Sequence, residues 1–194
     1  HFAELLDKAR AVARESNVHV LENESLVIGG VRFLGATFWT DFNLFGDQCQ
    51  SECMQLAEGC MSDYRMIFTG PPEALRRIRP QETLERHNES RAWLHHEIST
   101  SQEPCVVITH HGPSYKVCRV EYQNDLLTAA FLNNADDLIR PPVKAWIYGH
   151  THQALRHEIN GVSVLSNQRG YPGQEVPGFN WGACFEIDQS STLT

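Results

Sequence analysis

Two short apolar runs, each followed by histidines, constrain the fold of this chain more than any other feature. The run "CVVIT" is followed by His110 and His111, and the run "VKAWIY" is followed by a glycine and then by His150 and His152. Continuous apolar runs of this length are typical of strands that are buried on both faces. In open α/β sheets, ligands bind beyond the carboxyl ends of the strands. We therefore expect these histidines to meet at one edge of a sheet.

The remaining pattern predicts a single domain, residues 1–194, of mixed α/β class. Gly29-Gly30 and Asn160-Gly161 each separate two strand-like runs, as expected for β-hairpins. Apolar residues at helical spacing predict further elements. We expect helices over residues 2–15, 48–67, 72–98 (interrupted at Pro80) and 123–131, and a last strand over residues 183–188.

Charge and cysteine content narrow the classes of function. The net charge of -8 argues against non-specific nucleic-acid binding, which depends on basic patches. No window approaches the roughly twenty apolar residues of a membrane span. The six cysteines form no C-x-x-C pair, which favours free thiols in a cytoplasmic protein over a zinc site or a disulfide framework. Because the first residue is His1, we expect the chain to begin part-way through a longer protein, so an upstream targeting signal stays possible.

The histidines themselves indicate a metal centre. Residues two apart in an extended chain point the same way, and Gly149 would let the backbone turn sharply before His150 and His152. Imidazole suits zinc, iron, manganese or nickel. A lone histidine at a strand end is usually only a hydrogen-bonded loop residue, but two strand ends with matching chemistry favour ligation.

Four segments resemble the calcineurin-like metallophosphoesterases. They are "VVITHHGPS", "YGHTH", "SNQRGYPG" and "VRFLGATFWTDFNLFGD", the last similar to a subgroup of small bacterial members. The resemblance implies a β-sandwich flanked by helices in four layers. It also implies two divalent metal ions, with manganese, iron or zinc as the expected identities. The implied reaction is hydrolysis of a phosphomonoester or a phosphodiester on a phosphorylated small molecule.

The family site is built from five motifs, D-x-H, G-D, G-N-H-[DE], a lone histidine and G-H-x-H. By resemblance, His110 matches the lone histidine, and His150 and His152 match the last motif, so these three are the expected metal ligands. His111 is the alternative ligand and otherwise a substrate-binding residue. Asn167 and Arg169 match a substrate-binding loop of the subgroup, with Gln168 where proline is usual. Arg169 is equally consistent with a structural ion pair.

The first three motifs are not matched. The sequence contains no D-x-H and no Asn-His, and its one Gly-Asp, Gly46-Asp47, follows an aromatic loop and is not assigned. We therefore expect the catalytic residues upstream of His1, and little activity from this chain alone. Uncovered strand edges would then favour homo-oligomers. Two alternatives stay open: an inactive scaffold or binding module of the same fold, and a mononuclear metallohydrolase completed by Asp41, Asp47 or Asp63.

Overall fold

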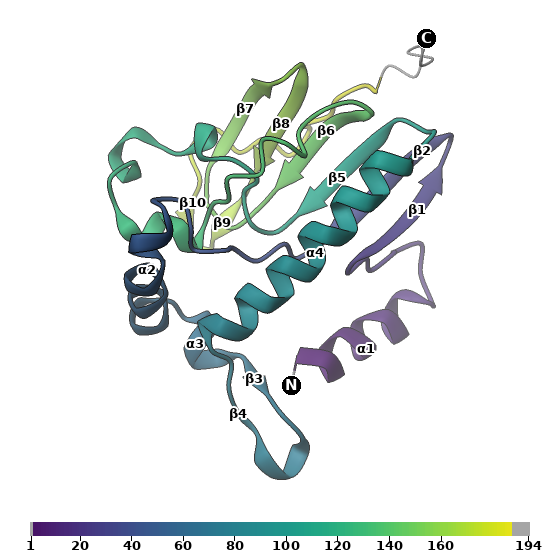
Figure 1. Cartoon of the computed structure of the whole chain (residues 1–194). Helices are drawn as coiled ribbons and strands as arrows, with labels where there is room; N and C mark the ends of the chain where they lie inside the picture. The colour runs from purple at the N-terminus through teal and green to yellow at the C-terminus, as the bar shows by residue number, and fades with distance from the viewer. Residues whose placement is uncertain (1, 188–194) are drawn as a thin grey trace.

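One six-stranded sheet forms the centre of the molecule (Figure 1). The computed structural model describes residues 2–187. The sheet contains β1 (Glu24–Ile28), β2 (Val31–Ala36), β5 (Cys105–Thr109), β6 (Val143–Tyr148), β7 (Ala154–Ile159) and β8 (Val162–Asn167). The spatial order is β1-β2-β5-β6-β8-β7. β2, β5, β6 and β8 run parallel, while β1 and β7 pair antiparallel at the two edges. The four parallel strands therefore end at the same edge of the sheet.

Both predicted hairpins are confirmed. Gly29 and Gly30 connect β1 to β2 with φ of 58° and 79°, and Asn160 and Gly161 connect β7 to β8 with φ of 52° and 77°. Positive φ at both central residues is the requirement of the type I′ turn, and glycine and asparagine reach it at the lowest cost. The turn residues thus fix the register of the two edge strands.

The longest helix, α4 (Pro80–Thr100), packs diagonally across one face of the sheet (Figure 1). Leu94 and Ile98 are buried from the helix side, against Leu34, Val107 and Trp146 of the sheet. Burying each aliphatic side chain of this size contributes roughly 1.5–3 kcal/mol relative to exposure. This core holds the central strands, and with them the edge at which they end.

The opposite face of the sheet is covered differently from the expectation. Val31, Val106 and Ala145 are buried there, with Phe185 and Ile187 of the C-terminal segment packed against them. The mixed α/β class, a multi-stranded sheet flanked by helices, is confirmed. The second sheet of the expected sandwich is not formed by residues 2–187, whose other strands make only two-stranded ribbons. These are β3 (Phe68–Thr69) with β4 (Arg76–Arg77), and β9 (Gly170–Tyr171) with β10 (Gln174–Glu175).

Shorter helices surround the sheet. α1 (Phe2–Ala13) contacts β1 through an ion pair between Arg10 and Glu24. α2 (Asp47–Cys60), α3 (Asp63–Met66) and the 3₁₀ helix η4 (Leu126–Ala130) enclose a second apolar core. The other 3₁₀ helices are η1 (Pro72–Ala74), η2 (Tyr115–Val117) and η3 (Val120–Tyr122).

Two predicted elements are wrong. Residues 72–79 form η1 and β4 rather than a helix, and Pro80 begins α4 instead of interrupting one. Proline is well suited to the first helical position because it has no N–H to leave unsatisfied. Residues 183–187 form no strand, although Phe185 and Ile187 are partly buried; residue 188 of that prediction lies outside the described residues.

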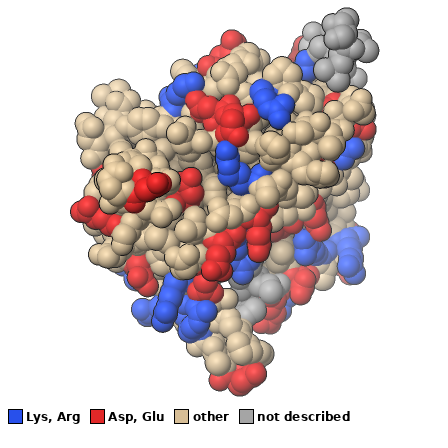
Figure 2. Space-filling view, viewed as in Figure 1, with Lys and Arg blue, Asp and Glu red and all other residues tan. Residues whose placement is uncertain are grey.

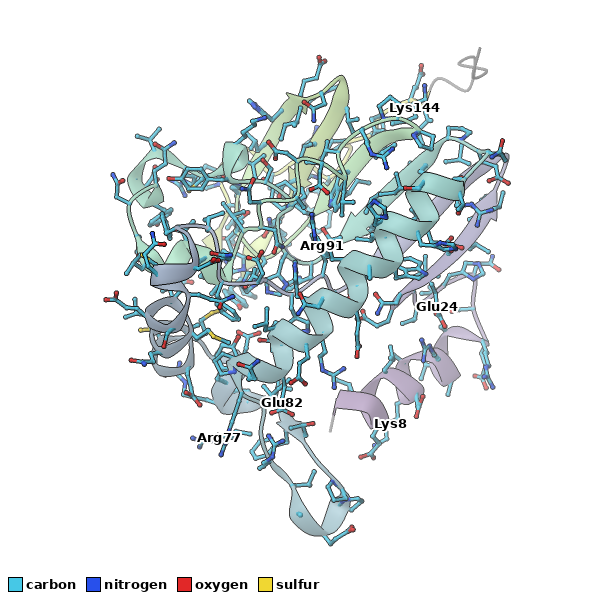
Figure 3. All side chains as sticks on the ribbon, viewed as in Figure 1. Lys8, Glu24, Arg77, Glu82, Arg91 and Lys144 are labelled. Carbon is cyan, nitrogen blue, oxygen red and sulfur yellow. The ribbon has the colours of Figure 1, made fainter. Side chains whose placement is uncertain are left out.

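The surface carries both signs of charge, interspersed over the face drawn in Figure 2. Ion pairs tie α4 to its neighbours, with Arg76 bonded to Glu82 at 2.5 Å and Arg91 to Asp137 at 2.9 Å. Figure 3 shows Glu82 at the start of α4 and Arg91 near its middle. Such exposed pairs typically contribute at most about 1 kcal/mol each. All six cysteines are free thiols. Within residues 2–187, no helix combines the length and apolarity that crossing a bilayer requires.

Candidate metal centre

The predicted histidines lie where the parallel strands end. His110 and His111 follow β5, His150 follows β6, Thr37 follows β2, and Gln168 follows β8. Because β2, β5, β6 and β8 are parallel, these residues share the carboxyl edge of the sheet. The prediction that two separate strand ends deliver histidines to one place therefore agrees with the topology.

Backbone hydrogen bonds hold these strand ends together. The amides of His110 and His111 both donate to the carbonyl of Thr37, at 3.2 Å and 3.3 Å. Thr37 is fixed in turn, since its amide and hydroxyl donate to the Glu22 carboxylate at 2.8 Å and 2.7 Å. On the other side, the amide of Gly149 donates to the carbonyl of His110 at 3.0 Å. The two histidine loops are thus part of one bonded unit.

The turn after β6 is made by the histidines and not by the glycine. His150 has φ of 66° and His152 has φ of 47°, whereas Gly149 does not have positive φ. The prediction that Gly149 supplies the sharp turn is therefore wrong. Glycine fits here because a Cβ would lie 3.2 Å from Nδ1 of His110 and 3.4 Å from its carbonyl oxygen. Left-handed backbone at two non-glycine residues costs of order 1 kcal/mol each and often occurs at functional sites.

Three imidazole rings are packed together at this edge. Nδ1 of His150 lies 3.1 Å from Nε2 of His110. The ring centroids of His150 and His111 are 4.4 Å apart, and those of His110 and His111 are 5.1 Å apart. Phe131 stacks on His150, with centroids 4.5 Å apart and planes 29° from parallel. The aromatic packing fixes the orientation of the His150 ring.

Two ring nitrogens of this cluster are buried without a partner. Nδ1 of His111 lies 3.3 Å from the carbonyl of Thr37, so that nitrogen carries the proton of a neutral ring. Nε2 of His111 then carries a lone pair, and neither it nor Nε2 of His150 has a hydrogen-bond partner among residues 2–187. A buried polar atom without a partner costs about 1–3 kcal/mol. Such atoms therefore indicate a place where water or a ligand completes the structure.

The surroundings keep these rings uncharged. The pKa of His150 is lowered from 6.5 to about 3, first because burial disfavours the charged ring and then because His110 and His152 repel an added charge. Burial, followed by His150 and His110, places the pKa of His111 well below its ordinary value. His110 keeps an exposed edge, and partial burial still lowers its pKa, against the opposing effect of Asp63. Neutral imidazoles offer lone pairs at neutral pH.

His152 points elsewhere. Its ring contacts the edge of Tyr171, with centroids 4.8 Å apart, and its amide donates to Oε1 of Gln168 at 2.7 Å. The expectation that His150 and His152 point the same way assumed extended backbone, which the positive φ values exclude. His152 still lies close enough to lower the pKa of both His110 and His150. Its role as a metal ligand stays a prediction.

The two other substrate-binding candidates face the C-terminal segment. The side chain of Asn167 donates to the carbonyl of Asn180 at 2.8 Å and accepts from its amide at 3.0 Å. The guanidinium of Arg169 lies over the ring of Trp181, 5.1 Å from its centroid. Both side chains therefore bind parts of the protein in this structure, and neither is joined to the histidine cluster by a contact found in the described residues.

The carboxylates considered for a one-metal site do not join the histidines. Asp41 accepts a hydrogen bond from the backbone amide of Asn43 at 2.9 Å, and Asp47 accepts one from the side chain of Asn43 at 2.6 Å. Asp63 affects His110 only electrostatically. Among residues 2–187, no group of three or more His, Cys, Asp or Glu is placed to hold a metal ion. The imidazoles, with their unpartnered nitrogens, are suitable donors for a divalent metal ion. The described residues alone do not supply a complete set of ligands.

Three site residues were not predicted as such. Gln168 connects the loop after β6 to the end of β8, because its side chain accepts from the His152 amide and donates to Thr151 at 3.1 Å and to Ser166 at 2.7 Å. Phe131 and Thr37 come from segments without any metal-binding pattern. Only for Gln168 did the sequence give a signal, since it replaces the proline expected in that loop.

Residues 36–154 match the family described as calcineurin-like phosphoesterase. The chain belongs to this family. The match extends from the end of β2 to the start of β7, so it contains the whole imidazole cluster. Calcineurin-like phosphoesterases generally bind divalent metals, and the family is one of metal-dependent phosphoesterases. The family predicted from the sequence motifs is confirmed.

This calcineurin-like chain is 27% identical over 180 residues to an uncharacterized protein of Acanthamoeba polyphaga mimivirus. The aligned region covers 89% of the chain and 61% of the viral protein, so the chain spans about three fifths of the length of this relative. The viral protein indicates no substrate, because it is itself uncharacterized.

Proposed function

We propose that the chain supplies the histidine-rich half of a two-metal site that hydrolyses a phosphomonoester or a phosphodiester. The observation that carries this proposal is the facing pair of nitrogens, Nε2 of His110 and Nδ1 of His150, at the carboxyl edge of a parallel sheet in a calcineurin-like domain. In such a site the metal ions polarise the phosphate and make water more acidic. His110 and His150 are the proposed ligands, with His152 or His111 as the third.

The protein residues prepare this site in three ways. Burial keeps His110 and His150 uncharged, so their lone pairs are available without loss of a proton at neutral pH. Phe131 fixes the ring plane of His150. The shared hydrogen bonds to Thr37 fix the start of the His110 loop. Preorganised donors of this kind lower the cost of ordering a ligand shell.

The anionic ligands of the site are proposed to come from outside residues 1–194. The sequence lacks D-x-H and Asn-His, and the described residues place no carboxylate with the histidines. The chain also spans only 61% of the mimivirus relative. We expect metal binding by this chain to be weak, and hydrolysis to require the additional segment.

Titration calorimetry with Mn²⁺ and Zn²⁺ tests the proposed ligands, and turnover of p-nitrophenyl phosphate and bis-p-nitrophenyl phosphate tests the reaction. We expect the chain to bind metal and a version extended upstream to gain turnover by orders of magnitude. For the alanine variants of His110 and His150, the matched control is His157→Ala, at an exposed histidine of β7. Equal metal-stimulated turnover with and without the extension would show that the proposed missing motifs are not required.

A non-catalytic scaffold is the second candidate. The observation that favours it is the lack of any three-ligand group among residues 2–187. A folded, extended protein that binds neither Mn²⁺ nor Zn²⁺ at millimolar concentration would support the scaffold and exclude the hydrolase.

A further inference from the structure

A pocket of about 250 Å³ lies beside the loop that carries His150 and His152. Its walls come from the segment that contains η3 and η4 and from the loop itself. The residues that decide its character are Leu127, Thr128, Phe131, Leu132 and Thr151. None of the predicted site residues lines it, so it is separate from the imidazole cluster.

Phe131 connects this pocket to the imidazole cluster. Its ring stacks on His150, with centroids 4.5 Å apart, and it also lines the pocket. Thr151, which follows His150 in the chain, lines the pocket too, and its hydroxyl accepts a hydrogen bond from Gln168. The pocket and the imidazole cluster therefore share Phe131 and the loop that carries His150.

The pocket offers apolar contact and no unpaired cation for an anion. Arg119 at its rim is paired with Glu121 at 2.6 Å and lies over the ring of Tyr122, 5.7 Å from the centroid. The carboxylate of Asp125 accepts from the amide of Leu127 at 2.9 Å. An anion would gain little here, whereas an uncharged ring would gain the burial of its apolar surface.

The side chains of Thr128 and Gln153 in the pocket already have hydrogen-bond partners. The hydroxyl of Thr128 donates to the carbonyl of Tyr122 at 2.7 Å. The side-chain amide of Gln153 donates to Val117 at 3.0 Å and to the hydroxyl of Tyr148 at 2.7 Å. Because these groups are satisfied, shape and apolar contact decide what binds. A volume slightly below the roughly 300–1,000 Å³ of drug-sized sites suits one or two rings.

We propose that this pocket binds a compact aromatic group that is esterified to the phosphate of the substrate. The proposal rests on the proposed function, since it assumes that the phosphate lies at the imidazole cluster. Phe131 would then contact the aromatic group on the pocket side and His150 on the other. Leu127 and Phe131 are the residues that would set the preference for an aryl over a small alkyl ester.

The test compares phenylphosphonate with methylphosphonate, two ligands that cannot be hydrolysed at the P–C bond, and adds phenol as a ring without phosphate. Binding is followed by titration of the ¹⁵N-labelled protein extended upstream, with and without Zn²⁺. We expect phenylphosphonate to bind at least about tenfold more tightly, and phenol to shift the amides of Phe131 and Thr151. Leu127→Trp would fill the pocket, and the affinities for phenylphosphonate and methylphosphonate should then be about equal.

The matched control is Leu126→Trp, which alters the same 3₁₀ helix at a residue that does not line the pocket. The comparison of the two phosphonates in the unsubstituted protein needs no variant, so it stands even if a tryptophan variant misfolds. Equal affinity for both phosphonates, or phenol shifts elsewhere, would overturn the pocket while leaving the proposed function intact. Binding of phenol but of neither phosphonate would overturn the ester assignment together with the proposed function.

Discussion

Nδ1 of His150 lies 3.1 Å from Nε2 of His110, although forty residues separate them in the chain. The two residues follow β6 and β5, which are adjacent and parallel, with Thr109 opposite Tyr148 at the end of the pairing. The strand register therefore decides this contact. A shift of one residue would turn the side chains of one strand to the other face of the sheet.

Alanine substitution of this pair should weaken metal binding more than it weakens the fold. We expect His110→Ala and His150→Ala each to reduce Zn²⁺ affinity by at least roughly tenfold, which corresponds to about 1.4 kcal/mol. The double variant should lose less than the sum, because both side chains act on one ion. Calorimetry measures the affinity, and His157→Ala is the control. Strict additivity would contradict a shared ion.

Gly149→Ala should disturb His110. The added Cβ would meet Nδ1 of His110 at 3.2 Å, so the ring must move by a few tenths of an ångström. We expect a loss of about 1 kcal/mol in the free energy of unfolding, and lower metal affinity. Gly59→Ala in α2 is the matched control, since a Cβ there meets nothing within 4 Å. It should gain about 0.5–1 kcal/mol. Equal gains in both variants would refute the close approach.

The free energy of unfolding of the metal-free protein should fall as the pH is lowered from 6.5. His87 is buried, its Nδ1 lies 2.6 Å from the carbonyl of Trp39, and burial lowers its pKa despite the opposing effect of Asp41. The unfolded chain therefore takes up protons below its ordinary pKa of 6.5 before the folded chain does. The same holds for His150, down to its pKa of about 3. Each such histidine contributes up to about 1.4 kcal/mol per pH unit.

Urea unfolding at several pH values between about 4 and about 8 measures this dependence, because the range includes the pH values below 6.5 at which the unfolded histidines take up protons. His87→Gln should make the dependence shallower. His95→Gln, on the exposed side of the same helix, is the control. An unchanged slope in His87→Gln would show that His87 does not contribute to the dependence.

Gln168→Ala should loosen the loop that carries His152. The substitution removes an acceptor for the His152 amide and the donor to Thr151 and Ser166. We expect a loss of roughly 1–3 kcal/mol in the free energy of unfolding, because these partners lose their hydrogen bonds. Faster amide exchange at His152 would report the loosening directly. Gln174→Ala in the exposed β9–β10 ribbon is the control, and a similar effect of both variants would contradict the role of Gln168.

The sequence predicted the parts of the site that depend on local pattern. The largely apolar runs before His110 and His150 specify buried strands, because apolar residues on both faces leave no polar face for solvent. Gly29-Gly30 and Asn160-Gly161 specify turns, because few residues adopt positive φ at low cost. The pattern over residues 72–98 predicts a helix that starts too early, because Pro80 is the first residue of α4 and not an interruption within a helix.

The sequence by itself determined that two buried strands end in histidines and that the chain is a calcineurin-like domain. Only the tertiary structure decided which rings meet: His111 joins His110 and His150, while His152 turns to Tyr171. The physical reason is that the spacing of two residues predicts a common direction only in extended backbone, and His150 and His152 have positive φ. The contributions of Phe131 and Thr37 arise from strand order and loop packing, which no local pattern encodes.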